Sequence, residues 1–284
     1  MAFGDTGQAA HRARGIALAL MAGVLWSLGG LLIKWVEWNA FAIAGARSLI
    51  AALVIWAYLR KPRFTWSPVQ LTAAVTYAAV VTLFVAANKL TTAANAIVLQ
   101  YTAPVFAAFF GWWLLGERAR RRDWVTLAVV MAAMTLFFMG KLSPGGMLGN
   151  LLALTSGVCF ALLVTLLRKQ RSGSNIESVL LGNVLTFLIG LPFMFQGSPG
   201  GHTWVGLIIL GVFQLGISYV LFAEAVKHIS AVESVLVPIV EPLLNPLWVL
   251  IVLHEAPGPW SLVGGAIVLT AVTVRCLMAP PKPS

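Results

Sequence analysis

The sequence has few charged residues and few cysteines. Only 10% of its 284 residues are Asp, Glu, Lys or Arg, and 60% are hydrophobic, whereas about a quarter of a soluble domain is usually charged. This composition excludes a water-soluble enzyme. The two cysteines, Cys159 and Cys276, have no paired spacing, so they predict neither a disulfide framework nor a metal site.

Long hydrophobic runs fill most of the chain. A bilayer core takes about 20 apolar residues per helix, so about ten such helices would leave only short loops. The alternation of a barrel strand is absent, and within such runs only helices satisfy every backbone group. We therefore expect an all-α integral membrane protein with ten transmembrane helices, forming a single membrane domain over 1–284. The predicted spans are 15–34, 40–59, 69–88, 93–115, 124–140, 147–168, 177–195, 204–226, 231–253 and 260–279.

Positive charge gathers on one side of the predicted membrane. If the N-terminus is cytoplasmic, fourteen of the nineteen Lys and Arg residues lie in cytoplasmic loops or tails, against three outside. Because Lys and Arg in short loops set orientation, we expect both termini to be cytoplasmic. Topology then explains the formal net charge of +10 without a nucleic-acid partner. The first apolar run has full bilayer length, so we expect a retained span instead of a cleaved signal.

Two stretches of the sequence recur at fixed offsets. Residues 15–34 align with 149–168, and residues 83–117 align with 221–255. The matches least expected by chance are Phe84 with Phe222, Lys89 with Lys227, Pro104 with Pro242 and Glu117 with Glu255. We predict two five-helix repeats, 15–141 and 147–279. An odd number of spans inverts the second copy, and inverted repeats are a recurring design of secondary transporters, whose substrate site lies between the halves near the midplane.

The repeated segments also carry a family resemblance. The strings AANKLTTAANAIVLQYTAPVFAAFFGWWLLGE (86–117) and AEAVKHISAVESVLVPIVEPLLNPLWVLIVLHE (223–255) resemble the two repeats of the drug/metabolite transporter superfamily, EamA type. Within it, the chain is most similar to the aromatic amino acid exporters of bacterial inner membranes. The resemblance implies a multi-pass inner-membrane carrier with a central cavity. It would export small amino acids, chiefly Phe, Trp and Tyr, by alternating access, either as a secondary or as a facilitative transporter.

Aromatic and polar side chains near the midplane are the candidate substrate contacts. Aromatic rings suit a flat apolar substrate, and polar side chains within a span usually face the bundle interior. The alternative is that the rings pack helices together and the polar groups join helices by hydrogen bonds. The predicted contacts are Trp26, Ser27, Tyr77, Phe84, Gln100, Tyr101, Phe160, Gln214, Ser218, Tyr219, Glu241, Asn245 and Trp248.

Two charged residues lie deep within predicted spans. Glu241 is the one acid near the centre of a span, and a buried carboxylate there could carry a proton or pair with a substrate ammonium group. Arg47 could hold a substrate carboxylate by two parallel hydrogen bonds. It could equally have a structural role, such as neutralising an acid or reaching the membrane surface. The resemblance adds that an acid–proline pair and an arginine at these places are usual in the family.

Prolines mark two of the spans. Pro238, Pro242 and Pro246 recur every four residues in 231–253, and Pro104 lies in 93–115. Each proline removes a helical N–H, so we expect a bent or open helix, a feature that transporters place at substrate sites.

Catalysis has no support in the sequence. The zinc-protease pattern that His254 and Glu255 begin lacks its second histidine, because residue 258 is Gly. No cofactor or metal motif is present, so we predict that the chain is not an enzyme. The alternative function is a broad-specificity drug or metabolite exporter of the same fold, acting on cationic compounds. The sequence leaves the oligomeric state and the coupling ion undetermined.

Overall fold

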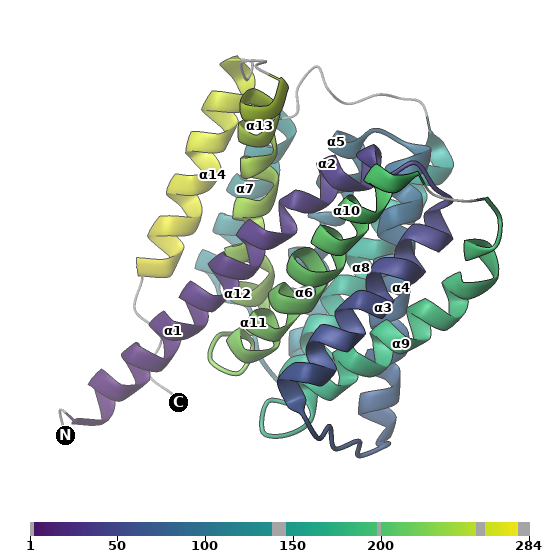
Figure 1. The fold of residues 1–284 in the computed structure, drawn as a ribbon. Coiled ribbons are helices and arrows are strands. Elements are labelled where there is room, and N and C mark those ends of the chain that lie inside the picture. The colour runs from purple at the N-terminus through teal and green to yellow at the C-terminus, as the bar shows by residue number, and fades with distance from the viewer. Residues whose placement is uncertain (1–2, 138–145, 198–199, 254–258, 278–284) are drawn as a thin grey trace.

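A computed structural model of the protein describes residues 3–137, 146–197, 200–253 and 259–277 (Figure 1). The regular secondary structure in these ranges is entirely helical. The α-helices are α1 (Phe3–Trp26), α2 (Leu28–Trp35), α3 (Ala40–Leu59), α4 (Pro68–Leu90), α5 (Ala93–Gln100), α6 (Ala103–Leu115), α7 (Arg121–Phe137), α8 (Met147–Lys169), α9 (Asn175–Met194), α10 (Gly201–Ile209), α11 (Ser218–Ala225), α12 (Ala231–Leu236), α13 (Val240–Leu253) and α14 (Pro259–Leu277). A π-helix, η1 (Leu210–Ile217), joins α10 to α11, and a 3₁₀ turn, η2 (Val237–Ile239), joins α12 to α13.

Within the described residues, seven helical stretches are long and apolar enough to cross a membrane. They are Ala10–Trp35, Ala40–Leu59, Pro68–Leu90, Asn95–Leu115, Met147–Lys169, Asn175–Met194 and Thr203–Ala225. The further helices α7, α12, α13 and α14 occupy the remaining predicted spans. The chain is thus an all-helical, multi-pass membrane protein, as the hydrophobic runs predicted, and the count of ten spans stays a prediction.

Several helices are interrupted partway, each for a local reason. Ser27 separates α1 from α2, and its Oγ donates to the carbonyl oxygen of Val24 at 2.5 Å. Thr102, between α5 and α6, bonds the carbonyl oxygen of Leu99 in the same way at 2.7 Å. Such bonds compete with the backbone ladder. The 3₁₀ turn η2 contains Pro238, which cannot donate a helical hydrogen bond.

The expected proline distortions are only partly present. The helix changes type at Pro238, but α13 runs without interruption through Pro242 and Pro246. Pro242 is the third residue of α13, and Pro104 is the second residue of α6. An N–H in a first turn has no partner within its helix, so proline costs little there.

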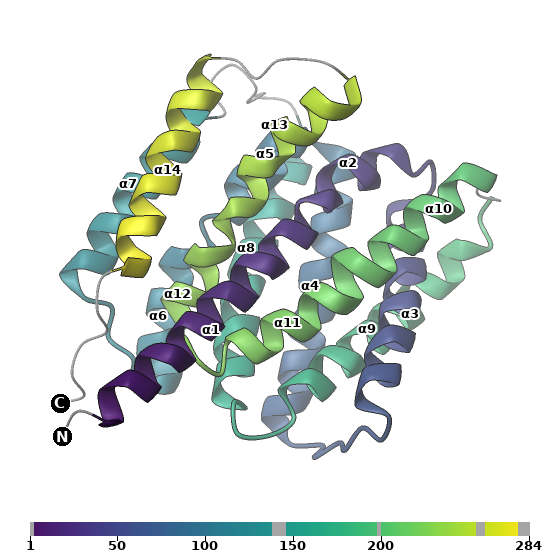
Figure 2. The ribbon, with the colours of Figure 1, turned by 60° about the vertical axis from the view of Figure 1, so that its left-hand side comes forward.

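Helix packing pairs the two predicted repeats. Extensive contacts join α3 to α9, α4 to α8, α7 to α14 and α1 to α11, and α7 and α14 lie together at one side of the bundle (Figures 1 and 2). In the predicted repeat, α1 corresponds to α8 and α4 to α11, so the α1–α11 contact is the counterpart of the α4–α8 contact. The α3–α9 and α7–α14 contacts each join a helix to its own counterpart. This symmetry supports the inverted repeat, which stays a proposal.

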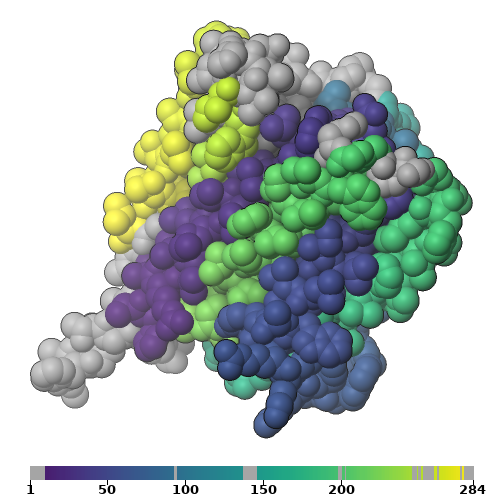
Figure 3. Space-filling model, viewed as in Figure 1, coloured from purple at the N-terminus to yellow at the C-terminus, as the bar shows by residue number. Residues whose placement is uncertain are grey.

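The α3–α9 contact is close because glycines meet there. A Cβ on Gly190 would lie 2.5 Å from the carbonyl oxygen of Phe41 and 2.7 Å from the Cα of Gly45. On the surface, α1 crosses one face of the molecule diagonally, between α14 and the segment from α10 to α11 (Figure 3). Large apolar side chains are exposed, Trp113 by 66% and Val125 by 63%, as expected of helices that face lipid.

Candidate functional site

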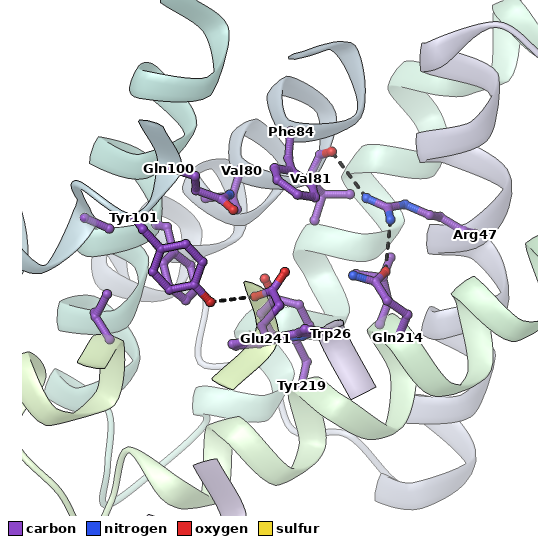
Figure 4. Close-up of a pocket in the computed structure, with 14 residues that line it drawn as sticks. Trp26, Arg47, Val80, Val81, Phe84, Gln100, Tyr101, Gln214, Tyr219 and Glu241 are labelled. Atoms are coloured by element: carbon purple, nitrogen blue, oxygen red, sulfur yellow. Dashed lines mark hydrogen bonds between the residues drawn. The ribbon is translucent and has the colours of Figure 1, made fainter. Parts of the chain in front are cut away.

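A central cavity is lined by residues from both predicted repeats. The space between its walls is about 510 Å³, a volume that includes open solvent at its mouth. Figure 4 shows its polar side chains arranged around one space. The lining residues are Trp26, Arg47, Val80, Val81, Phe84, Gln100, Tyr101, Ala103, Phe160, Gln214, Leu215, Tyr219, Val235 and Glu241.

Arg47 places a buried cation at this cavity. Its side chain comes from α3 and is 1% exposed. Nη1 donates to Oε1 of Gln214 at 2.9 Å, and Nη2 lies 3.5 Å from the carbonyl oxygen of Val81. Among the described residues Nε has no hydrogen-bond partner, and no ion pair with a carboxylate forms. Burying a charge without an opposite charge nearby is costly, and here only neutral groups contact the guanidinium.

Glu241 places an acid at the same cavity. Tyr101, in the break between α5 and α6, donates its hydroxyl to Oε2 of Glu241 at 2.8 Å (Figure 4). The carboxylate lies in the first turn of α13, where the helix dipole favours negative charge. It is 8% exposed, and it forms no ion pair within the described part of the chain.

Aromatic rings fill the space beside these groups. The ring of Trp26 lies 5.7 Å from Phe160, 5.1 Å from Tyr219 and 4.9 Å from Phe222, between centroids. Phe222 is fully buried behind the lining. The indole Nε1 of Trp26 is buried without a hydrogen-bond partner in the ranges that the structure covers. The cluster thus combines flat apolar surfaces with one unused donor.

The two glutamines fix the positions of the helices that carry them. Nε2 of Gln100 donates to Oγ of Ser156 at 2.9 Å, and that hydroxyl donates to the carbonyl oxygen of Val80 at 3.1 Å. Gln214 packs against Gly29, where a Cβ would lie 3.0 Å from its Nε2. α5, α8 and α4 are therefore joined beside the cavity, and Gln214 is held in place facing Arg47.

Most of the predicted contacts lie together, and four do not line the cavity. The eight that do are Trp26, Phe84, Gln100, Tyr101, Phe160, Gln214, Tyr219 and Glu241. The four others are occupied by hydrogen bonds: Trp248 Nε1 to Ser27 Oγ at 2.8 Å, Tyr77 Oη to Asn183 Oδ1 at 3.1 Å, and Ser218 Oγ to the carbonyl oxygen of Gln214 at 2.5 Å. The side chain of Asn245 lies outside the described residues.

Sequence reasoning missed the aliphatic part of the lining. Val80, Val81, Ala103, Leu215 and Val235 complete the walls. Nothing distinguishes these residues from the other apolar residues of the spans, so no signal in one sequence would have selected them.

A second cavity lies where α6 and α11 end and α12 begins. Its volume is about 1200 Å³ including open solvent, and it is lined mainly by basic side chains. Its acids are paired: Glu233 accepts from Arg12 at 2.7 Å and from Arg275 at 3.0 Å, and Arg275 also bonds Asp123 at 2.8 Å. This ionic network joins α1, α7, α12 and α14 at one end of the bundle.

Comparison with known proteins identifies the family. The profile of the EamA-like transporter family matches residues 13–139 and, separately, residues 147–275. A protein of known crystal structure has the same fold, with a TM-score of 0.78 at 20% identity, over 93% of this chain and 96% of that one.

Curated relatives are transporters of varied description. An uncharacterized transporter of Archaeoglobus fulgidus is 29% identical over 67% of this chain and 70% of its own length. The pseudopaline exporter of Pseudomonas aeruginosa is 25% identical over 90% of this chain and 94% of its own. An uncharacterized transporter of Bacillus subtilis is 24% identical over 82% and 80%. None of these relatives supports the aromatic amino acid subtype that the resemblance suggested. The chain belongs to the EamA-like transporter family, within the drug/metabolite transporter superfamily.

Proposed function

We propose that this transporter exports small amino acids, chiefly aromatic ones, across the bacterial inner membrane by alternating access. In this proposal the two inverted halves, 15–141 and 147–279, move about the central cavity, and both termini are cytoplasmic. One observation carries the substrate assignment. A buried guanidinium without a carboxylate partner and a buried carboxylate without a cationic partner, among the described residues, line one cavity with aromatic walls.

The proposed pose follows from charge complementarity. The substrate carboxylate binds Arg47, since a planar guanidinium suits a carboxylate. It supplies the negative charge that the neutral partner Gln214 does not. The substrate ammonium group binds Glu241, which Tyr101 orients. The aromatic side chain lies among Trp26 and its neighbouring rings, where ring–ring contacts are favourable.

A broader exporter of drugs or metabolites is the second candidate. The similarity to a pseudopaline exporter favours a metabolite other than a plain amino acid. A cationic compound would also suit Glu241 and the aromatic rings, because rings attract cations. Arg47 argues against a purely cationic substrate, because it would place like charges in one cavity.

Efflux from proteoliposomes tests the proposal. Vesicles are loaded with labelled phenylalanine, tryptophan, alanine or methyl viologen, with and without an imposed pH gradient. We expect phenylalanine and tryptophan to leave faster than from protein-free vesicles, and alanine to leave more slowly than either. A response to the gradient would indicate proton coupling and make Glu241→Gln the next variant. Movement of methyl viologen alone would refute amino acid export and favour the cationic alternative.

Substrate analogues test the proposed Arg47 and Glu241 contacts separately. Phenethylamine lacks the carboxylate and 3-phenylpropionate lacks the ammonium group, so we expect both to compete less well than phenylalanine. In Arg47→Gln the competition by phenylalanine and by 3-phenylpropionate should weaken at least about tenfold, because a charge-assisted contact is lost, while phenethylamine is unaffected. Arg63→Gln, an exposed arginine in the loop after α3, is the matched control. Equal losses for all three compounds in Arg47→Gln would mean a structural role.

A further inference from the structure

Two turns at opposite ends of the bundle are each held by one cation. At one end, Nζ of Lys34, in the last turn of α2, donates to the carbonyl oxygen of Thr91 at 3.0 Å. At the other end, Nη1 of Arg168, in the last turn of α8, donates to the carbonyl oxygen of Ile229. The repeat alignment pairs Lys34 with Arg168 and Thr91 with Ile229. Equivalent side chains thus hold equivalent carbonyls, and the helices that these turns begin, α5 and α12, lie toward opposite ends of the bundle (Figure 1).

Each held turn begins a short helix in the same way. Thr92 caps α5, accepting from the N–H of Asn95 at 3.1 Å, and Ser230 caps α12, accepting from the N–H of Glu233 at 3.2 Å. These caps occupy equivalent positions in the repeat. The cation therefore fixes the start of one short helix, α5 or α12, in each half.

Both short helices end at the central cavity. Gln100 is the last residue of α5, and Tyr101 follows it; α12 carries Val235, and η2 connects it to Glu241. The break after α5 and the turn η2 fall at equivalent positions, since Tyr101 aligns with Ile239. A helix interrupted at such a point can pivot there. Movement of either held turn is thereby transmitted to the cavity lining.

We propose that Lys34 and Arg168 act as two latches during alternating access. A latch here is the hydrogen bond from one of these side chains to its backbone carbonyl, which must break before that end of the cavity opens. Lys34 closes the cavity toward the end where α2 and α4 finish, and Arg168 closes it toward the end where α8 and α11 finish. Release of one latch lets its short helix pivot and opens that end alone. Both hydrogen bonds are present in this structure. The proposal rests on the alternating-access part of the proposed function and is independent of the substrate.

The bonding chemistry suits a reversible latch. A cation bound to a backbone carbonyl makes a charge-assisted hydrogen bond at a helix end, where carbonyls lack helical partners. Such a bond is strong enough to shift the equilibrium between the closed and the open conformation of one end. It still breaks readily, because water can replace the carbonyl as the partner of the cation. Arg168 is held more firmly than Lys34, because it also pairs with Glu117, whose Oε2 accepts the N–H of Ala231 at 3.1 Å. We therefore expect the Lys34 end to open more readily.

Labelling of a cysteine in the cavity tests the latches. Cys159 and Cys276 are replaced by Ser, and Ala103→Cys, whose parent side chain is 1% exposed in the cavity lining, reports access of a membrane-impermeant maleimide from each face. Gly173→Cys, in the loop after α8, identifies the Arg168 face. We expect Lys34→Gln to raise labelling from the Lys34 face about tenfold, and Arg168→Gln to raise it from the Arg168 face about tenfold.

Matched variants separate latch loss from damage to the fold. Lys34→Arg and Arg168→Lys keep a donor and should label like the parent, and Arg171→Gln removes an exposed positive charge three residues after Arg168 without effect. Each variant must elute as the parent does in size-exclusion chromatography. If Arg168→Gln fails to fold, Glu117→Gln, which loosens the same latch, should raise labelling from the same face. Labelling that rises from both faces together, or from neither, overturns the proposal. An absence of amino acid flux leaves this result intact.

Discussion

The two predicted halves share one architecture but supply different chemistry. Each breaks a helix at an equivalent point beside the cavity. The first half does so at Tyr101 and Thr102 and contributes a hydroxyl donor, whereas the second uses a 3₁₀ turn at Pro238 and then presents Glu241. Arg47 comes from the first half, and its partner Gln214 comes from the second. The cavity therefore carries a positive group and a negative group on different helices, because Arg47 comes from α3 and Glu241 from α13.

The two ends of the bundle also share a backbone arrangement but use different side-chain chemistry. Asn95 and Glu233 both occupy the third position of a short helix. Nδ2 of Asn95 donates to Oδ1 of Asn150 at 3.0 Å, a neutral contact. Glu233 instead binds two arginines, Arg12 and Arg275. Equivalent backbone positions thus support a neutral hydrogen bond at one end and an ionic network at the other.

The largest effect is expected at the ionic end. Glu233→Ala leaves Arg12 and Arg275 without this partner in a site where the carboxylate and Arg275 are at most 10% exposed. We expect a loss of about 3–5 kcal/mol of stability, the cost of removing one partner of a buried pair. Asn95→Ala should cost only about 1 kcal/mol. Thermal unfolding in detergent measures both, and equal losses would contradict the comparison.

The contact between the halves is the next most sensitive. Gly190→Ala forces a Cβ onto the backbone of α3, 2.5 Å from the carbonyl oxygen of Phe41. Because backbone cannot yield as a side chain does, we expect a loss of about 1–3 kcal/mol. Gly201→Ala, at the start of α10 with nothing within 4 Å, is the control and should unfold at the parent temperature. A Gly190→Ala protein of parental stability would show that α3 and α9 are not tightly packed.

A moderate effect on substrate binding is expected from the hydrogen bond between Tyr101 and Glu241, which joins the two predicted halves. Tyr101→Phe removes the hydroxyl that donates to Glu241 at 2.8 Å. We expect phenylalanine binding to weaken by about 1–1.5 kcal/mol, a typical contribution of one hydrogen bond. Binding is measured by calorimetry in Tyr101→Phe, Glu241→Gln and the double variant. If the two residues act together, the double variant should lose less than the sum of the single losses, and strict additivity would show that they act independently.

The smallest effect concerns a pair of equivalent lysines. Lys89 donates to the carbonyl oxygen of Val36 at 2.8 Å, whereas its counterpart Lys227 pairs with the partly exposed Glu224 at 2.7 Å. Lys227→Met should cost no more than about 1 kcal/mol, and the loss should shrink in salt. Lys89→Met should show a loss that salt changes less, because its partner is a neutral carbonyl. Thermal unfolding at low and high salt distinguishes them, and identical salt responses would contradict the difference.

Much of the fold followed from local sequence features. The apolar runs predicted the helices, and the similarity of 83–117 to 221–255 predicted which segments would have similar breaks. Pro238 was expected to distort its helix and does so. Pro242 and Pro246 were expected to do the same, but α13 continues through them. Pro242 lies in the first turn of α13, where a proline costs little, and the start of α13 was not visible in the pattern.

The candidate site was harder to predict because polar residues have two uses in a membrane span. Gln214 and Ser218 are four residues apart, and both were predicted to contact the substrate. Gln214 lines the cavity, whereas Ser218 bonds the carbonyl oxygen of Gln214. Tyr77 and Trp248 likewise bond other helices. The partners of Tyr77 and Trp248 lie on segments distant in the sequence, so neither partner could be predicted from one span alone.

The sequence by itself determined that the chain forms apolar membrane helices. It also predicted an orientation from the distribution of Lys and Arg and a correspondence between the halves, because charge bias and repeats are properties of order along the chain. Tertiary structure alone decided that Arg47 meets Gln214, that Tyr101 meets Glu241, and that Lys34 and Arg168 hold equivalent turns at opposite ends. These contacts join residues far apart in sequence. They depend on which helices pack together and at what depth, and hydrophobicity alone does not specify helix partners inside a bilayer.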